Sequence, residues 1–142
     1  MTALNEAEFA GDVQLAIENA FKGKSYSNYY IAAKSIGTKV IRYLLDNPMF
    51  KDAKVVWLTP ILQNDEVYNA MVNSNNKGLC IFGEKDSFCF KLERFEVLKN
   101  NPNLILRVID GGNHSLELEK DPIRSIELLK SVIAEINEFC GQ

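Results

Sequence analysis

The sequence predicts an α/β protein with a mostly parallel sheet and helices on both faces of that sheet. Segments of strand length and helix length alternate along the chain, and the strand segments are near-continuous apolar runs. Such runs are typical of parallel strands that are buried on both sides. The predicted strands are residues 29–34, 53–58, 79–82 and 104–109. The chain lacks linkers, internal repeats and low-complexity tracts, so residues 1–142 are expected to form a single domain.

The helical segments are predicted from apolar residues that recur at spacings of three and four. They are residues 5–22, 35–46, 65–73, 91–99 and 122–139. Each helix is expected to bury its apolar side against the sheet or a neighbouring helix. The residues expected to point inward include Ile36, Leu92, Ile126, Leu129, Ile133, Ile136 and Phe139.

Composition and charge exclude several classes of function. The 16 basic and 19 acidic residues give a net charge of −3, and the basic residues are scattered, so neither nucleic acid nor a membrane surface is an expected partner. No apolar run approaches the ~20 residues that span a bilayer. The cysteines, Cys80, Cys89 and Cys140, are odd in number and lack metal-site spacing. They predict reduced thiols in a cytoplasmic protein.

The first predicted strand ends in Ala33-Lys34-Ser35-Ile36-Gly37, a small-x-Ser-x-Gly turn that leads directly into helical spacing. A serine on such a turn holds its hydroxyl out at the end of the sheet. The following amide, of Ile36, points with the helix dipole toward the place where an oxyanion would form. Residues two before and two after the serine must be small, because strand and helix backbones pass close together. The alternative is that Ser35 is a helix N-cap.

Two further strands end near residues with chemical capability. Asp86 follows the third strand, and His114, the only histidine, follows the fourth. Ligand and catalytic sites in open parallel sheets lie at the carboxyl ends of the strands. A serine nucleophile needs a base, and the base needs a group that fixes its tautomer. Taken singly, Asp86 and His114 would be loop residues. Cys89 lies between two phenylalanines, which favour a packing role for it. As a set, Ser35, Asp86 and His114 predict a nucleophile, an orienting acid and a base.

Three segments together resemble the α/β-hydrolase superfamily. Residues 33–37 are similar to its nucleophile elbow, residues 81–86 to its strand-then-G-x-x-D segment, and residues 108–115 to its strand-then-G-x-x-H segment. They occur in the order of the family, and the resemblance covers about residues 5–140. It implies hydrolysis of an ester or related acyl bond and no metal or organic cofactor. Because no cap domain is visible, an open site and a small, soluble acyl substrate are expected.

By this resemblance Ser35 is the nucleophile, His114 the base, Asp86 the acid that orients the base, and the Ile36 amide part of the oxyanion hole. The chain departs from the family at Ala33, where glycine is usual. It also departs at its start, because the strands before the nucleophile strand, and the second oxyanion donor, are missing. Losing one such donor typically costs about 10²–10³ in rate. A chain that represents part of a longer hydrolase is an alternative explanation of the missing strands.

If the strands stack in chain order, strand 29–34 is an outer strand with unpaired amides, which favours association. A second copy of the protein, or a segment near the N-terminus, is expected to cover this edge. The first functional hypothesis is therefore a serine hydrolase of the carboxylesterase type. The second is a non-catalytic interaction or assembly module on a truncated hydrolase core. A nucleotide-binding domain has little support, because no Gly-rich turn follows the first strand.

Overall fold

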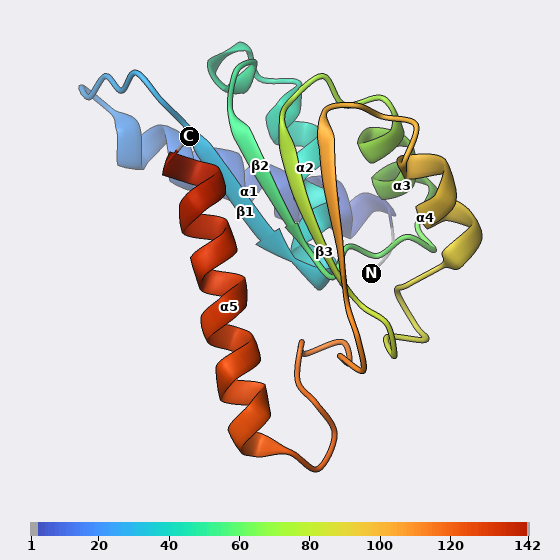
Figure 1. The fold of residues 1–142 in the computed structure, drawn as a ribbon. Helices are drawn as coiled ribbons and strands as arrows, with labels where there is room; N and C mark the ends of the chain where they lie inside the picture. The colour runs from blue at the N-terminus through green and yellow to red at the C-terminus, as the bar shows by residue number, and fades with distance from the viewer. Residues whose placement is uncertain (1–2, 142) are drawn as a thin grey trace.

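The computed structural model describes residues 3–141 and contains a four-stranded parallel sheet with the strands in chain order (Figure 1). The strands are β1 (Tyr30–Lys34), β2 (Lys54–Leu58), β3 (Gly78–Gly83) and β4 (Leu104–Ile109). All three neighbouring pairs are parallel. The predicted α/β class is confirmed, and β1 is an outer strand, as expected from stacking in chain order.

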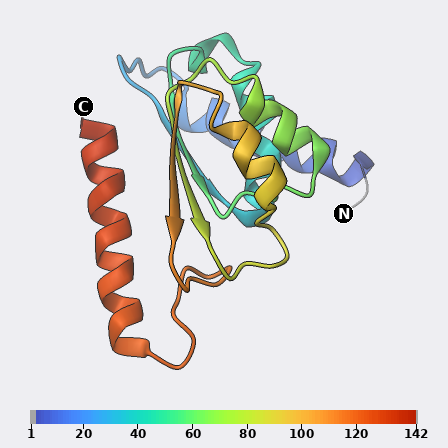
Figure 2. The same cartoon turned by 45° about the vertical axis from the view of Figure 1, so that its right-hand side comes forward.

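Helices cover both faces of the sheet, as predicted, but unequally. They are α1 (Ala3–Phe21), η1 (Ser35–Gly37), α2 (Thr38–Leu45), η2 (Pro48–Phe50), α3 (Asp65–Val72), α4 (Leu92–Leu98) and α5 (Pro122–Gly141). Figure 2 shows α5 on one side of the sheet and the other long helices on the opposite side. Among the described residues, none of the helices combines the length and apolarity that a membrane span requires.

Strand side chains alternate between two hydrophobic cores, because successive residues of a strand point to opposite faces. Trp57 and Phe82 belong to the larger core, under α1 to α4. Val56 and Ile81 belong to the smaller core, which α5 closes with Val132 and Phe139. The sheet is therefore buried on both faces along β2 and β3, which explains the unbroken apolar runs.

Several residues that helical spacing placed inward are exposed. The corrected residues are Ile36, Leu92, Ile126, Leu129 and Ile133, whereas Phe139 is buried as predicted. Helical spacing identifies apolar residues, but it does not say which part of a wide apolar arc meets the sheet. In α5 the buried part centres on Val132, and the rest of the arc stays outside.

The expectation that an N-terminal segment covers the edge of β1 is wrong for the described residues. The segment forms α1, which packs against α2, and the hydrogen-bonded neighbour of β1 is β2. The other edge of β1 is thus open within residues 3–141.

Candidate active site

Ser35 lies at the carboxyl end of β1, in a backbone conformation that side chains other than glycine seldom adopt. Its φ is 53°, in the left-handed region, which costs of order 1–3 kcal/mol for a residue with a Cβ. The hydroxyl of Thr38 donates a hydrogen bond of 2.6 Å to the Ser35 carbonyl and so ties the turn to the start of α2. This strained turn projects the Ser35 side chain above the end of the sheet.

The small residues around Ser35 are less tightly packed than the sequence pattern predicts. A Cβ placed on Gly37 would lie 3.5 Å from the Cβ of Ala33, which is an ordinary van der Waals contact. Gly37 has a φ of −60°, so its backbone does not require glycine either. The turn therefore has room for alanine at both positions, and Ala33 is compatible with it.

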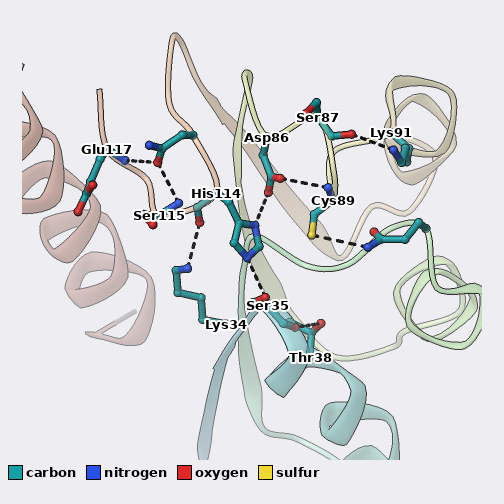
Figure 3. A network of polar contacts seen from close by, with 12 residues as sticks. Lys34, Ser35, Thr38, Asp86, Ser87, Cys89, Lys91, His114, Ser115 and Glu117 are labelled. Atoms are coloured by element: carbon teal, nitrogen blue, oxygen red, sulfur yellow. Dashed lines mark hydrogen bonds and ion pairs between the residues drawn. The ribbon is translucent and has the colours of Figure 1, made fainter. Parts of the chain in front are cut away.

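Ser35, His114 and Asp86 form one chain of hydrogen bonds (Figure 3). The Ser35 Oγ is 2.8 Å from Nε2 of His114, and Nδ1 of His114 is 2.6 Å from Oδ2 of Asp86. An ionised carboxylate only accepts, so Nδ1 carries the proton and donates it to Asp86. Nε2 is then the acceptor for the Ser35 hydroxyl. The three side chains that the sequence predicted as a set thus lie together in the order that the chemistry needs.

Asp86 is held from both sides of its carboxylate and from its backbone. Its Oδ1 accepts the amide N–H of Cys89 at 3.1 Å, while its own amide donates to the Gly83 carbonyl at 3.1 Å. The side chain is 3% exposed. A buried carboxylate with both oxygens hydrogen-bonded has little freedom to rotate, so it presents Oδ2 to His114 in one direction.

The loop that carries His114 packs directly on the end of β3. A Cβ on Gly83 would lie closer than 3.0 Å to the carbonyl oxygens of Gly112 and Asn113, so only glycine fits there. The side-chain oxygen of Asn113 accepts the amides of Ser115 and Glu117 at 2.9 and 3.0 Å. These contacts make the loop a compact turn whose position depends on β3.

Two more side chains link this loop to its neighbours. The Nζ of Lys34, the residue before Ser35, donates a hydrogen bond of 3.0 Å to the His114 carbonyl and so links the Ser35 turn to the His114 loop (Figure 3). The Oε2 of Glu84 accepts the amide of Gly111 at 2.8 Å. Glu84 is therefore a structural partner of the His114 loop.

Scans of protein-family models and of curated proteins give no match to this chain. Solved structures of other proteins are similar to this chain, among them the following two. One is a predicted CIB-like hydrolase from Thermoplasma acidophilum, with 18% identity and a TM-score of 0.61 over 94% of this chain and 58% of that one. The other is an uncharacterized protein from Bacillus cereus ATCC 10987, with 20% identity and a TM-score of 0.64 over 94% of this chain and 44% of that one.

The fold is α/β-hydrolase-like. The chain spans about half the length of these similar proteins, so their remaining parts have no counterpart in the 142 residues. Within the shared hydrolase-like core, the order of the three site residues along the chain is Ser35, Asp86, His114. Similarity at this level of identity establishes the fold and leaves the role of each residue as a prediction.

Ile36, predicted to supply an oxyanion-binding amide, occupies the second position of η1. Backbone N–H groups in the first turn of a helix have no partner within the helix, and the helix dipole makes this end attractive to anions. The Ile36 side chain is 49% exposed, which places the residue at the surface next to Ser35. Binding of an oxyanion by this amide stays a prediction.

A buried threonine, Thr59, directly follows β2 at its carboxyl end, between the carboxyl ends of β1 and β3. Thr59 is 1% exposed, has a φ of 39°, and its Oγ1 lacks a hydrogen-bond partner among the described residues. The sequence marked this position only as the end of a strand. Thr59 therefore contributes a second strained residue to the carboxyl edge of the hydrolase-like sheet.

Cys89 lies next to the site, but its thiol takes no part in the hydrogen-bonded chain from Ser35 to Asp86. Burial, and then the nearby Asp86 carboxylate, raise the pKa of its thiol, which keeps it protonated. Its Sγ, with ligand atoms of Asp86 and His114, falls within a 4.8 Å cluster that has metal-ligand residue types. However, metal binding requires a thiolate and would break the bond between Asp86 and His114. The donor set fits a hydrogen-bonded cluster better than a metal site.

Sequence reasoning missed Lys34, Thr38 and the backbone amide of Cys89 as supports of the site. Lys34 occupies the variable position of the turn pattern, so residue type gives no signal there. Thr38 had a weak signal, because threonine hydroxyls often bond to the carbonyl three residues earlier. The amide of Cys89 could only be found once the turn after Asp86 was known.

Proposed function

We propose that the protein is a serine hydrolase that cleaves an ester or a related acyl bond. The observation that carries this proposal is the hydrogen-bonded chain from Ser35 through His114 to the buried Asp86, at the carboxyl edge of an α/β-hydrolase-like sheet. Packing alone does not require a serine, a histidine and a carboxylate in this order. The same arrangement makes a serine nucleophilic in proteins of unrelated fold.

In the first half of the proposed reaction, Ser35 Oγ attacks the acyl carbonyl while Nε2 of His114 takes the hydroxyl proton. The imidazolium that forms is stabilised by Asp86, which accepts the Nδ1–H and stays ionised. The carbonyl oxygen becomes an oxyanion, and the Ile36 amide donates to it. His114 then gives its proton to the leaving alcohol, which leaves an acyl ester on Ser35.

In the second half, a water molecule replaces the alcohol. His114 takes a proton from the water as it attacks the acyl ester, and then returns that proton to Ser35 Oγ as the acid leaves. Each proton that enters Nε2 leaves it again, so the enzyme ends in its starting state. Apart from Ser35 and His114, no residue has to change protonation, because Asp86 stays ionised throughout.

A small acyl substrate fits the exposure of the site. The His114 side chain is 39% exposed, and the neighbouring Ile36 is 49% exposed. The segment between Thr59 and Phe90 is occupied by α3, β3 and the turns around them, and adds no cap over the site. A substrate therefore reaches Ser35 from solvent, with little enclosed surface to select a long acyl chain.

The decisive test is labelling with a fluorophosphonate, read by intact mass. Ser35 Oγ should displace fluoride from phosphorus and give a single adduct. The control is Ser35→Ala, which should fold identically by circular dichroism and take no label. A panel of short-chain esters should then be hydrolysed by the parent protein and not by the variant. An adduct that persists in Ser35→Ala would contradict the assignment of the nucleophile.

An interaction or assembly module is the second candidate. It is favoured by the open edge of β1 and by the match to only 58% and 44% of the similar chains. A well-folded protein that takes no fluorophosphonate and hydrolyses no ester in the panel would support this candidate and refute the hydrolase.

A further inference from the structure

Helix α5 exposes a row of large apolar residues. Ile126, Leu129 and Ile133 are 65%, 53% and 50% exposed, respectively. They are three and four residues apart, so they lie along one side of the helix, in the spacing that packs against another helix. Isolated exposed apolar residues are common, but a contiguous row on one helix marks an interaction surface.

The direction of this row follows from the contacts of α5. At 100° per residue, Leu129 and Ile133 lie on one side of the buried residue Val132, and Glu135 lies on the other. Glu135 forms an ion pair of 3.4 Å with Arg107 of β4. Because the polar side of α5 faces β4, the apolar row faces β1.

The part of β1 on this face of the sheet is also uncovered. Ile31 and Ala33 belong to the core under α1 to α4, so Tyr30 and Ala32 point to the α5 face. Both are exposed, and Tyr30 is 51% exposed. Between the row on α5 and these residues lies a corner, which we call the α5–β1 corner; Lys34 ends the same face of β1 at its carboxyl end.

The corner is hollowed at both of its ends. At the start of α5, a hollow is lined by Leu116, Ile126 and Leu129 among others. At the end of α5, another is lined by Tyr30 and Cys140 and also by polar residues such as Asn28 and Asp52. The corner therefore extends along α5, which has the length of a 20-residue helix, about 30 Å.

We propose that the α5–β1 corner binds a second copy of this chain, with α5 of each copy packed into the corner of the other. The only residues of the printed sequence outside the described part are 1, 2 and 142, so the occupant is not another segment of these 142 residues. The corner needs a helix with apolar residues on an exposed side, and α5 is such a helix. A surface that contains both the corner and the helix that fits it is self-complementary, as a two-fold interface requires.

The area fits a weak dimer. Each α5 helix, about 30 Å long and about 10 Å wide, would bury one strip of its own surface, and the exposed face of β1, about 17 Å long, would add a second strip in each copy. Together these strips bury on the order of 900 Å², the size of a weak, concentration-dependent interface. Pairing of the five-residue β1 edge alone covers a strand only about 17 Å long.

Edge-to-edge pairing of β1 would also leave the row on α5 exposed. Helix α5 packs over β2 and β3, through Val56, Leu79 and Ile81. In a continuous sheet joined at β1, the two α5 helices would be about four strand spacings apart, or ~19 Å. Packed helices are 8–10 Å apart. The exposed row thus favours docking of the helices over pairing of the edges.

The test is sedimentation velocity of the full chain over a range of concentrations. The parent protein should dimerise, and Leu129→Lys should weaken the dimer at least about 30-fold, the effect of an interface hot spot of 2 kcal/mol. The matched control is Leu15→Lys on α1, where the leucine is 57% exposed on the opposite side of the molecule. This variant should dimerise like the parent, and circular dichroism should show that both variants are folded.

Three results would overturn the proposal. The first is a parent protein that stays monomeric at ~100 μM, well above the micromolar range expected of an interface of this size. The second is a dimer that survives Leu129→Lys, including one formed through the edge of β1. The third is a monomer that binds a different polypeptide on α5. None of these results depends on hydrolase activity, so the two proposals fail or stand separately.

Discussion

The turn that carries Ser35 and the loop that carries His114 reach the same hydrogen bond by different means. The Ser35 turn has a strained φ of 53° but spare room, since a Cβ on Gly37 would make only an ordinary contact at 3.5 Å. The His114 loop has no such room, because its backbone lies against Gly83 more closely than any side chain allows. Local conformation therefore positions the serine, whereas contact with β3 positions the histidine.

This difference matters for the effects of mutation. A change in the Ser35 turn should act mainly through local backbone conformation. A change at the contact between β3 and the His114 loop should move a whole loop, and with it one partner of the hydrogen-bonded chain. Three substitutions test this comparison. The first tests whether activity depends on the hydrogen bond from His114 to Asp86.

Asp86→Asn should have the largest effect on activity. Its side-chain oxygen can still accept the Cys89 amide, but its NH₂ group then faces Nδ1 of His114. Nδ1 must accept, so Nε2 carries the proton and cannot take one from Ser35. We expect kcat for a short-chain ester to fall about 10⁴-fold.

The matched control for Asp86→Asn is Glu84→Gln, which removes the same charge from a neighbouring carboxylate that binds Gly111 instead of His114. We expect its kcat to change only a few-fold. Equal losses in the two variants would show that general charge, rather than the tautomer of His114, controls the rate.

Gly83→Ala should have an intermediate effect. The added methyl group meets the carbonyl oxygens of Gly112 and Asn113, so either β3 or the His114 loop must shift. Overpacking of this kind costs about 1–3 kcal/mol of unfolding free energy. A displacement of His114 by ~1 Å should lower kcat/KM about 10²-fold. Urea denaturation and ester hydrolysis measure the two effects, and full activity in this variant would contradict the role of the contact.

Gly37→Ala should have the smallest effect. Its φ of −60° suits alanine, and the new methyl group has space beside Ala33. The unfolding free energy should stay the same or rise by about 0.4–1 kcal/mol, because alanine restricts the unfolded chain. Ester hydrolysis should stay within about threefold of the parent. A loss as large as that of Gly83→Ala would show that the two turns are equally tight.

Much of the candidate site could be predicted from the sequence because strands and helices alternate along the chain, and each is recognised from local residue patterns. The parallel arrangement brings the carboxyl ends of β1, β3 and β4 to one edge, which is why residues as distant as Ser35 and His114 meet. Each of them directly follows a strand or the turn that ends one. The residue types, in this order, then limited the chemistry to few alternatives.

The supports of the site were not predictable in the same way. The bond from Lys34 to the His114 carbonyl joins residues 80 positions apart, and any long polar side chain at that position would look the same in the sequence. The tight contact at Gly83 involves backbone atoms of another loop. Such contacts depend on how two turns approach each other, which residue type does not encode.

By itself, the sequence determined the alternation of strands and helices, the parallel sheet and the set of Ser35, Asp86 and His114, because periodicity and residue type act locally. Only the tertiary structure decided which part of the apolar arc of α5 is buried. Leu129 and Val132 are equally apolar, yet contact with the sheet buries Val132 and leaves Leu129 exposed. The physical reason is that one helix can turn only one side to the sheet, and the side is selected by all of its contacts together, including the pairing of Glu135 with Arg107.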